Sequence, residues 1–212
     1  MSKISFQPNA VGSGTFTIAS PNSGTNRTLT LPDETGTVLT AASSLAAANL
    51  TGTVASGRMP AGSVLQVVSN QLTSSGSKSG GSWQTILSAS ITPSNSSNKI
   101  IVMGTTMIAH LEGGALEFGL RLFNGTSAVV EGDASGSATR AFLNKSIFDE
   151  AYSSFSTSMS AMETAGTVSS KTYSIQGYGS ESQGFYYNRT KTLSGDYTFK
   201  GATTIILMEI AA

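Results

Sequence analysis

The segment Thr15–Thr40 alternates short strand patterns with turn residues, and it constrains the fold more than any other part of the sequence. Apolar residues alternate with threonines in two short runs, which is the period-2 pattern of strands with one apolar face. These apolar residues are Phe16 and Ile18 in the first run and Leu29 and Leu31 in the second. Turn-forming residues follow each run, at Pro21–Gly24 and Pro32–Gly36. Because an isolated hairpin is marginal in water, we expect this segment to pack against other copies of the chain.

The composition favours strands and turns over helices along the whole chain. Ser and Thr supply 61 of the 212 residues and Gly supplies 23, whereas only 11% of the residues are charged. This mixture suits strands joined by tight turns and is poor for long helices. The chain is also long enough to bury a real core. We therefore expect an all-β protein with two modules.

Charge balance and the lack of cysteine exclude several classes of function. Lys plus Arg and Asp plus Glu each number 12, so no basic field is present to attract nucleic acid. Without Cys, the chain has no disulfide, thiolate nucleophile or Cys-based zinc site. The first residues lack an apolar signal region, and no window approaches 18 consecutive apolar residues. We expect no nucleic-acid partner, no membrane insertion and no classical secretion.

Residues that commonly carry out chemistry are sparse. His110 is the sole histidine, and its apolar neighbours predict a partly buried structural side chain. The alternative is an ion held by three copies of His110 on a trimer axis. The acidic pairs Asp33-Glu34 and Asp149-Glu150 are adjacent in sequence, so their side chains point apart on a strand. Motifs for nucleophilic catalysis and phosphate binding are missing, and we expect no enzyme activity, no cofactor and no bound metal.

The chain divides into three predicted parts. Residues 1–40 form an N-terminal anchor and β stalk, and residues 41–62 form a linker or collar rich in Ala and Gly. Where the stalk meets the linker, Thr40–Leu50 has the composition of a short helix with Thr40 as its N-cap, which partner copies would have to stabilise. Residues 63–212 form a head domain.

Strand patterns recur at fairly regular spacing through the head. The predicted strands are Ser63–Ser69, Gln84–Thr92, Lys99–Ala109, Leu116–Leu122, Ala128–Glu131, Ser153–Glu163, Lys171–Gly177, Gly184–Asn188, Asp196–Lys200 and Thr203–Ile210. Between them, Thr73–Ser82 predicts a flexible loop, Asn124-Gly125 a type I′ hairpin turn, and Gly132–Ala151 a loop or a single helical turn. Without a sustained 3.6-residue period, the pattern favours an antiparallel β-sandwich or jelly roll.

The last predicted strand, Thr203–Ile210, is apolar on both faces except at Glu209. Such a strand would be prone to aggregate as a free sheet edge. We expect it to lie centrally in a sheet or to be covered by a neighbouring subunit. Lys99–Ala109 is also apolar enough to be a central strand.

Two blocks near the N-terminus resemble known proteins phrase by phrase. They are TFTIASPNSGTNRTLTLPDETGTVLT (15–40) and AANLTGTVASGRMPAGSVLQVV (47–68). Both closely resemble fibre-type virion proteins of tailed bacteriophages, notably those of cyanobacterial and marine phages. The phrases ITPSNSSNKIIV (91–102), TYSIQGYG (172–179) and TTIILMEIA (203–211) more loosely resemble the C-terminal heads of such fibres. The resemblance implies a homotrimer whose head is a sandwich like the jelly roll of complement C1q or tumour necrosis factor.

Several aromatic residues fall at or near predicted loop boundaries, where they could stack on the faces of sugars. These candidate receptor contacts are Trp83, Tyr178, Tyr186 and Tyr187. Packing in the core or at a subunit interface is the alternative reading of the same residues. In the stalk, the residues expected to fill a core shared by three chains are Phe16, Ile18, Leu29, Leu31, Val38 and Leu39.

Taken with the resemblance, these patterns lead us to expect a structural virion protein on the outer surface of a phage particle. Its N-terminus would dock on other virion proteins of the tail or capsid, and its head would face a host-surface glycan. This would be a short tail fibre or spike. The alternatives are a head fibre or capsid-decoration trimer, and a carbohydrate-binding module with no role in a virion.

Overall fold

A computed structural model describes residues 11–15, 17, 19, 22–26, 28, 52, 54–111, 116–147, 153–180, 183–196 and 198–212. The chain divides into two compact units, Met1–Thr51 and Gly52–Ala212. The six predicted stalk-packing residues and the helix-sized segment Thr40–Leu50 lie outside the described residues. Near the start of the second unit, Ser56–Arg58 forms one turn of 3-10 helix.

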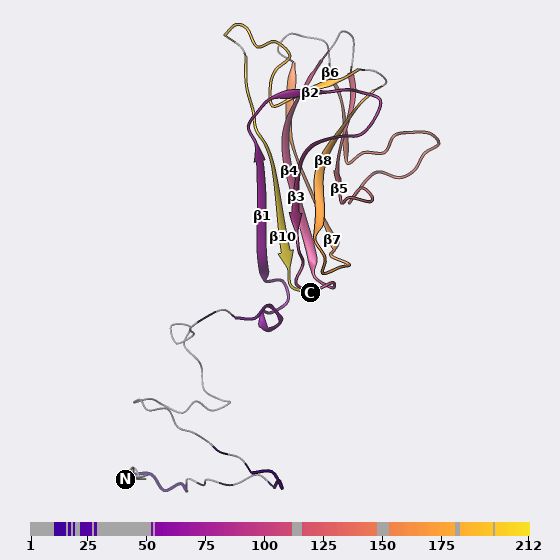
Figure 1. The fold of residues 1–212 in the computed structure, drawn as a ribbon. Helices are drawn as coiled ribbons and strands as arrows, with labels where there is room; N and C mark the ends of the chain where they lie inside the picture. The colour runs from indigo at the N-terminus through magenta and orange to yellow at the C-terminus, as the bar shows by residue number, and fades with distance from the viewer. Residues whose placement is uncertain are drawn as a thin grey trace. The chain divides into compact units, whose positions relative to one another are not determined.

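The second unit is all-β and contains two antiparallel sheets (Figure 1). The larger sheet consists of β1 (Val64–Leu72), β10 (Thr203–Ile210), β4 (Lys99–His110), β7 (Ser154–Thr164), β9 (Phe185–Tyr187) and β2 (Gly76–Lys78). The smaller sheet consists of β3 (Gln84–Ile91), β8 (Lys171–Gly179), β5 (Leu116–Phe123) and β6 (Leu143–Ile147).

Strands early in the chain pair with strands late in the chain. β1 pairs with β10, β3 with β8, β4 with β7 and β5 with β6, all antiparallel. The long strand β4 also pairs with β10 along its first half and with β9 at its end. β10 is therefore central in the larger sheet, as expected from its apolar sequence.

The two sheets pack face to face around one core. In β10 and in the first half of β4 every second residue is buried, as the pleat requires. The larger sheet contributes, among others, Ile100, Val102, Ile205 and Leu207, and the smaller sheet contributes Phe118, Leu120, Leu122, Tyr173 and Ile175. Phe118 and Phe185 meet edge to face with ring centroids 4.8 Å apart.

The carboxylates of Glu209 and Glu163 lie at the end of the sandwich where the chain terminates. Glu209 is fully buried and accepts hydrogen bonds from Asn98 (2.6 Å), Gln66 (2.6 Å) and both the backbone N–H and the hydroxyl of Ser94. Burial raises the pKa of Glu209, but these hydrogen bonds outweigh it and hold the pKa below its usual range.

Glu163 ties the two sheets together at the same end. Its carboxylate accepts hydrogen bonds from Tyr173 (2.7 Å) and Asn124 (3.0 Å) and pairs with Lys171 (2.6 Å). Burial opposes the charge, yet these partners hold the pKa of Glu163 below its usual range. Burial and the bond to Glu163 raise the pKa of Tyr173, so its hydroxyl remains a donor.

A buried polar chain lies near the other end of β10. Asn188 has φ +57° and donates to the carbonyls of Leu72 (2.8 Å) and Ser74 (3.0 Å). Its side-chain oxygen accepts the hydroxyl of Thr203 (2.8 Å), which in turn meets the hydroxyl of Thr106 (2.8 Å). These bonds join β1, β4 and β10 to the residue that follows β9, and they satisfy polar groups that would otherwise be costly to bury.

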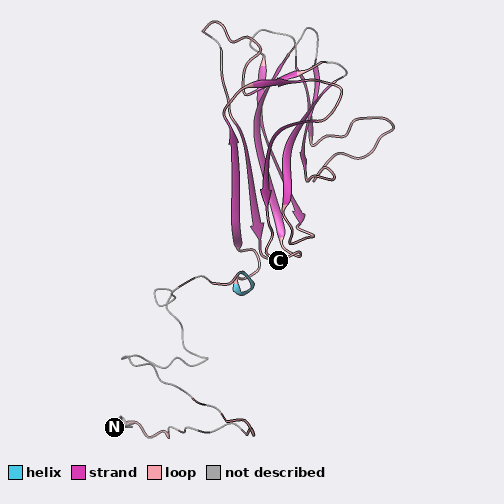
Figure 2. Cartoon of the chain, viewed as in Figure 1, coloured by secondary structure: helices cyan, strands magenta, loops and turns pink. Residues whose placement is uncertain are grey.

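Most of the predicted strands are confirmed, and β10 has the predicted bounds. Two predictions are wrong. Asp196–Lys200 makes only an isolated bridge from Lys200 to Arg189, and Phe199 is 64% exposed. Ala128–Glu131 is likewise reduced to one bridge, after which the chain forms the projecting loop between β5 and β6 (Figure 2).

Three further segments differ from their predictions. Gly125 has φ +92°, but Asn124 does not have a positive φ, so the turn is not type I′. Instead, the side chain of Asn124 accepts hydrogen bonds from the backbone N–H groups of Thr126 and Ser127. The predicted loop Thr73–Ser82 contains β2, and the irregular segment Gly132–Ala151 contains β6.

Candidate interaction surfaces

The outer face of the larger sheet carries large apolar side chains on four adjacent strands, mainly toward the end where β10 terminates. We call it the apolar face; its large members are Val64, Val67, Ile101, Met103, Met162, Ile206, Met208 and Ile210. Three of them are widely exposed: Val67 and Met162 at 58% each and Val64 at 50%. In these four strands, which the structure describes in full, Lys99 is the one charged residue at an outward position. An exposed cluster of large apolar side chains with few charges commonly marks a surface that a partner covers.

Strand register explains why these side chains form one surface. Val67 pairs with Met208, Met208 with Ile101 and Ile101 with Met162, so four apolar residues form a row across the sheet. In the next row, Ser69, Ile206, Met103 and Ser160 are partners. Since residues in one row point to the same side of a pleated sheet, the rows make one contiguous patch.

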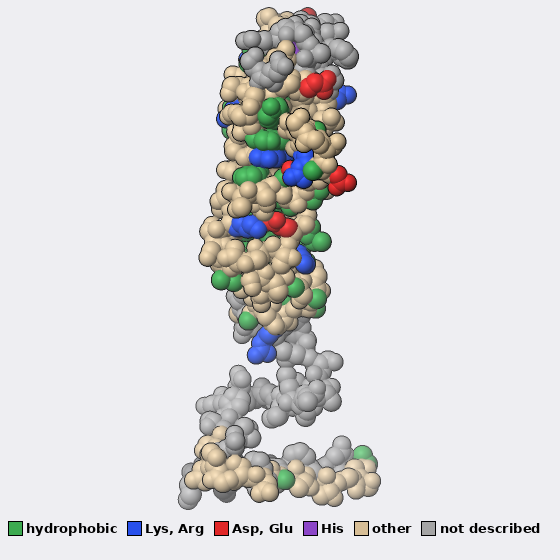
Figure 3. All heavy atoms as spheres, turned by 90° about the vertical axis from the view of Figure 1, so that its right-hand side faces the viewer, with side chains coloured by type: hydrophobic (Ala, Val, Ile, Leu, Met, Phe, Trp, Pro, Cys, Tyr) green, Lys and Arg blue, Asp and Glu red, His purple; other side chains and the backbone are tan. Residues whose placement is uncertain are grey.

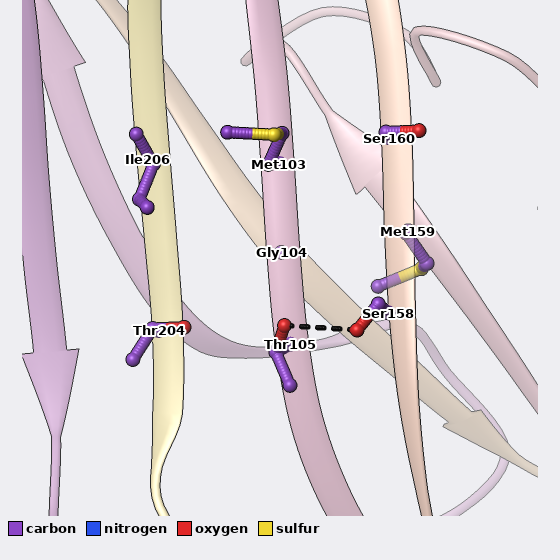
Figure 4. Close-up of a pocket in the computed structure, with 8 residues that line it drawn as sticks. All are labelled: Met103, Gly104, Thr105, Ser158, Met159, Ser160, Thr204 and Ile206. Atoms are coloured by element: carbon purple, nitrogen blue, oxygen red, sulfur yellow. Dashed lines mark hydrogen bonds between the residues drawn. The ribbon is translucent and has the colours of Figure 1, made fainter.

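Shallow hollows flank β10 on this face. One, of about 260 Å³, lies over β10, β4 and β7, and Figure 4 shows its lining residues. Ile206, Met103 and Ser160 lie side by side in one row, and Thr204, Thr105 and Ser158 in the next. Thr105 and Ser158 are joined by a hydrogen bond of 3.1 Å. A second hollow, of about 480 Å³, lies on the other side of β10, toward Ser69 and Gln71. Protruding side chains of a partner surface would fit such hollows.

The outer face of the smaller sheet carries a cluster of stacked side chains. Trp83 and Tyr178 lie with ring centroids 5.5 Å apart at 53°. The guanidinium of Arg121 lies 4.2 Å from the Trp83 ring and 4.7 Å from the Phe123 ring, and its Nε donates to Gln176 (2.8 Å). Each contact restricts the next side chain, so the cluster is held in one arrangement.

The structure thus brings together two of the four candidate receptor contacts and separates the others. Trp83 and Tyr178 share the outer face of the smaller sheet. Tyr186 is on β9 of the larger sheet, where Arg189 stacks on its ring at 4.1 Å. Tyr187 packs against the core, and its ring fills the space beside Gly76.

His110 is fully buried within this chain. It occupies an inward position at the end of β4, opposite Phe185 of β9. The sequence predicted a partly buried structural residue, and the side chain is more enclosed than that. Within the described part of the chain, no three His, Asp or Glu residues come together in a group that could hold a metal ion.

Sequence reasoning did not select Arg121, Val67 or Met162. Arg121 alternates with buried leucines in β5, so the sequence pattern predicts that its side chain points outward. Its stacking between two aromatic rings depends on strand pairing, which the pattern does not predict. Val67 and Met162 are apolar residues at outward positions of their strands, and this signal becomes visible only when the inward face is known.

Charge is distributed evenly on the side of the second unit from which the loop between β5 and β6 projects. Figure 3 shows acidic and basic side chains interspersed there, without a large field of one sign. Among the described residues, no helix is long and apolar enough to cross a membrane. Neither the known protein families nor the curated proteins include a match to this sequence.

Proposed function

We propose that this chain is the subunit of a homotrimeric phage fibre or spike, anchored on the particle by its N-terminal segment and displaying the β unit outward for host attachment. The observation that carries the proposal is the apolar face of the larger sheet. Eight large apolar side chains at outward positions, with Lys99 as the one charge, are unfavourable in water and favourable in a subunit interface.

The strand pairing supports a jelly-roll topology for this unit. When an eight-stranded hairpin is rolled up, its first strand pairs with its last, its second with its seventh, and so on. Leaving out the three-residue strands β2 and β9, the pairs β1–β10, β3–β8, β4–β7 and β5–β6 follow that rule. In a trimer of such units, we place the apolar face at the subunit contacts and the smaller sheet outward.

The phage role itself rests on the resemblance of residues 15–40 and 47–68 to fibre-type virion proteins. That resemblance supports docking on the particle through the N-terminal segment. A head fibre or capsid-decoration trimer needs the same anchor and the same subunit interface. A map of the virion separates the two roles: a few trimers around the tail indicate a fibre, and many copies over the shell indicate decoration.

The assembly step is tested by sedimentation of the full-length chain at micromolar concentration. We expect a mass three times that of one chain. Val67→Glu places a charge in the middle of the apolar face and should shift the protein toward monomers, because an unpaired charge is costly to bury in an interface. Val168→Glu is the matched control, since Val168 is also a 58% exposed valine but lies in the turn between β7 and β8.

A folded wild-type monomer at this concentration would contradict the trimer and favour the carbohydrate-binding module. Equal dissociation by Val67→Glu and Val168→Glu would show that the apolar face is not the interface. Circular dichroism of both variants confirms that the β unit is folded, so that loss of assembly is not loss of fold.

A further inference from the structure

A hollow on the outer face of the smaller sheet lies beside the stacked cluster. It measures about 310 Å³ and is lined by Glu117, Phe118, Gly119, Thr139, Ala141, Asn144, Tyr178 and Ser180. Ligand pockets in proteins begin at about 300 Å³, so this hollow suits a ligand of one ring. The apolar face, on the other sheet, is separate from it.

The floor of the hollow depends on the absence of a side chain at Gly119. Gly119 pairs with Asn144 of β6 on one side and with Tyr178 of β8 on the other, so the three residues form a row across the sheet. A Cβ at this position would lie 3.3 Å from the Cβ of Ala141 and 3.4 Å from the Trp83 ring. Glycine thus lets Ala141 and the Trp83 ring lie close over the strand, and the hollow lies beside them between an aromatic wall and a polar wall.

The aromatic wall is preorganised. Tyr178 lies against Trp83, Trp83 against Arg121, and Arg121 is held by Phe123 and Gln176. Little side-chain entropy remains to be lost when a ligand contacts Tyr178, which favours binding. The negatively polarised face of an aromatic ring attracts the C–H bonds of a sugar ring.

The opposite wall carries spare hydrogen-bonding capacity. Within the described part of the chain, the side chains of Glu117, Thr139 and Asn144 make no hydrogen bond to other residues. Together they offer a carboxylate acceptor, a hydroxyl and an amide, which can donate to and accept from the hydroxyl groups of a sugar.

The charge of the hollow selects against anions. Glu117 is its one charged lining residue, and the nearby guanidinium of Arg121 is already engaged by two rings and Gln176. A carboxylated sugar would face like charge at Glu117 with no cation in the lining to compensate. An uncharged ring with several hydroxyls meets no such cost.

We propose that this hollow binds a neutral pyranose sugar, with Tyr178 against the ring and Glu117, Asn144 and Thr139 on its hydroxyls. The inference rests on the proposed function in one respect, namely that attachment to a host surface gives the site its role. The ligand class is an uncharged saccharide, and the site lies on the smaller sheet, whereas Tyr186 is on the larger sheet.

The test uses the full-length chain and the fluorescence of Trp83, which is the sole tryptophan. The probes are glucose, galactose, mannose and N-acetylglucosamine, with glucuronic acid as the charged comparison. We expect at least one neutral sugar to give a saturable change with a millimolar dissociation constant, an ordinary affinity for a ligand of about 12 non-hydrogen atoms. Glucuronic acid should bind at least about tenfold more weakly, because of the charge at Glu117.

Matched variants locate the site. Tyr178→Ala should weaken binding at least about tenfold, and Tyr186→Ala, the same substitution on the other sheet, should leave it within about twofold. Asn144→Ala, at an exposed position, provides a second variant if Tyr178→Ala does not fold. Equal losses in Tyr178→Ala and Tyr186→Ala, stronger binding of glucuronic acid, or no response to any neutral sugar would overturn the proposal.

Sedimentation of the same samples separates this proposal from the previous one. A trimer that binds none of the neutral sugars refutes the sugar site alone. A monomer that binds one of them refutes the assembly alone.

Discussion

Glu209 shows how one buried charge makes this β unit dependent on pH. Its carboxylate is fully buried and surrounded by donors from Gln66, Ser94 and Asn98. Because these donors hold the folded-state pKa below its usual range, folding favours the ionised form. The resulting stability is complete above the unfolded-state pKa of about 4.3 and is lost as the pH falls toward the lowered folded-state pKa.

We expect Glu209→Gln to destabilise the protein at pH 7 by about 1–3 kcal/mol, because the NH₂ group of the new glutamine would face N–H and O–H groups that now donate to the carboxylate. We also expect its unfolding free energy to fall less steeply than that of wild type between about pH 5 and pH 3. Denaturant unfolding at fixed protein concentration measures both. Asp133→Asn, at an exposed loop position, is the control and should follow wild type. An unchanged pH slope in Glu209→Gln would show that Glu209 is not a titrating group of the folded state.

Residue types alone do not predict these networks. The sequence identifies Glu209 as the one charged residue in an apolar strand. It does not identify the hydrogen-bond partners Ser94 and Asn98, which lie more than a hundred positions away in sequence. The same applies to the stacking of Trp83 on Arg121 and Tyr178, which requires β3, β8 and β5 to be neighbours. Sequence identifies such residues singly, whereas strand pairing decides which of them meet.

At the scale of elements, prediction succeeded where a strand has a long apolar pattern of its own. β10 and β4 are examples, since their burial alternates over most of their length. β2 has the sequence Gly-Ser-Lys and carries no apolar signal; it is a strand because it pairs with β9. Asp196–Lys200 is the opposite case, because it contains an apolar residue, Phe199, but does not form the predicted strand. No sheet face covers the Phe199 side chain.

Packing between elements gives a second prediction, at Gly177 of β8. A Cβ there would lie 2.7 Å from Cζ of Phe185 and 2.8 Å from Cζ of Phe118, and both rings are almost fully buried. We expect Gly177→Ala to destabilise the protein by about 1–3 kcal/mol through overpacking. Gly57→Ala, where a Cβ meets nothing within 4 Å, should have little effect. Thermal unfolding compares the two variants, and equal midpoints would show that the rings have room to shift.

At the scale of the whole molecule, the question is which unit drives assembly. Among the described residues, every member of the hydrophobic core belongs to Gly52–Ala212, so we expect the fragment 52–212 to fold without the first unit. The apolar face belongs to the same fragment, which predicts that it still forms trimers. Contacts contributed by residues 1–51 in the full chain would add to the association free energy, and by mass action they would lower the concentration at which trimers persist.

We therefore expect the fragment 52–212 to be trimeric at high concentration and to dissociate on dilution at concentrations where the full-length chain remains trimeric. Sedimentation equilibrium over a dilution series measures both. If the fragment dissociates at the same concentration as the full chain, the first unit adds nothing to assembly and serves docking alone. If the fragment is a monomer at every concentration, the apolar face is covered by another partner, and residues 1–51 hold the chains together.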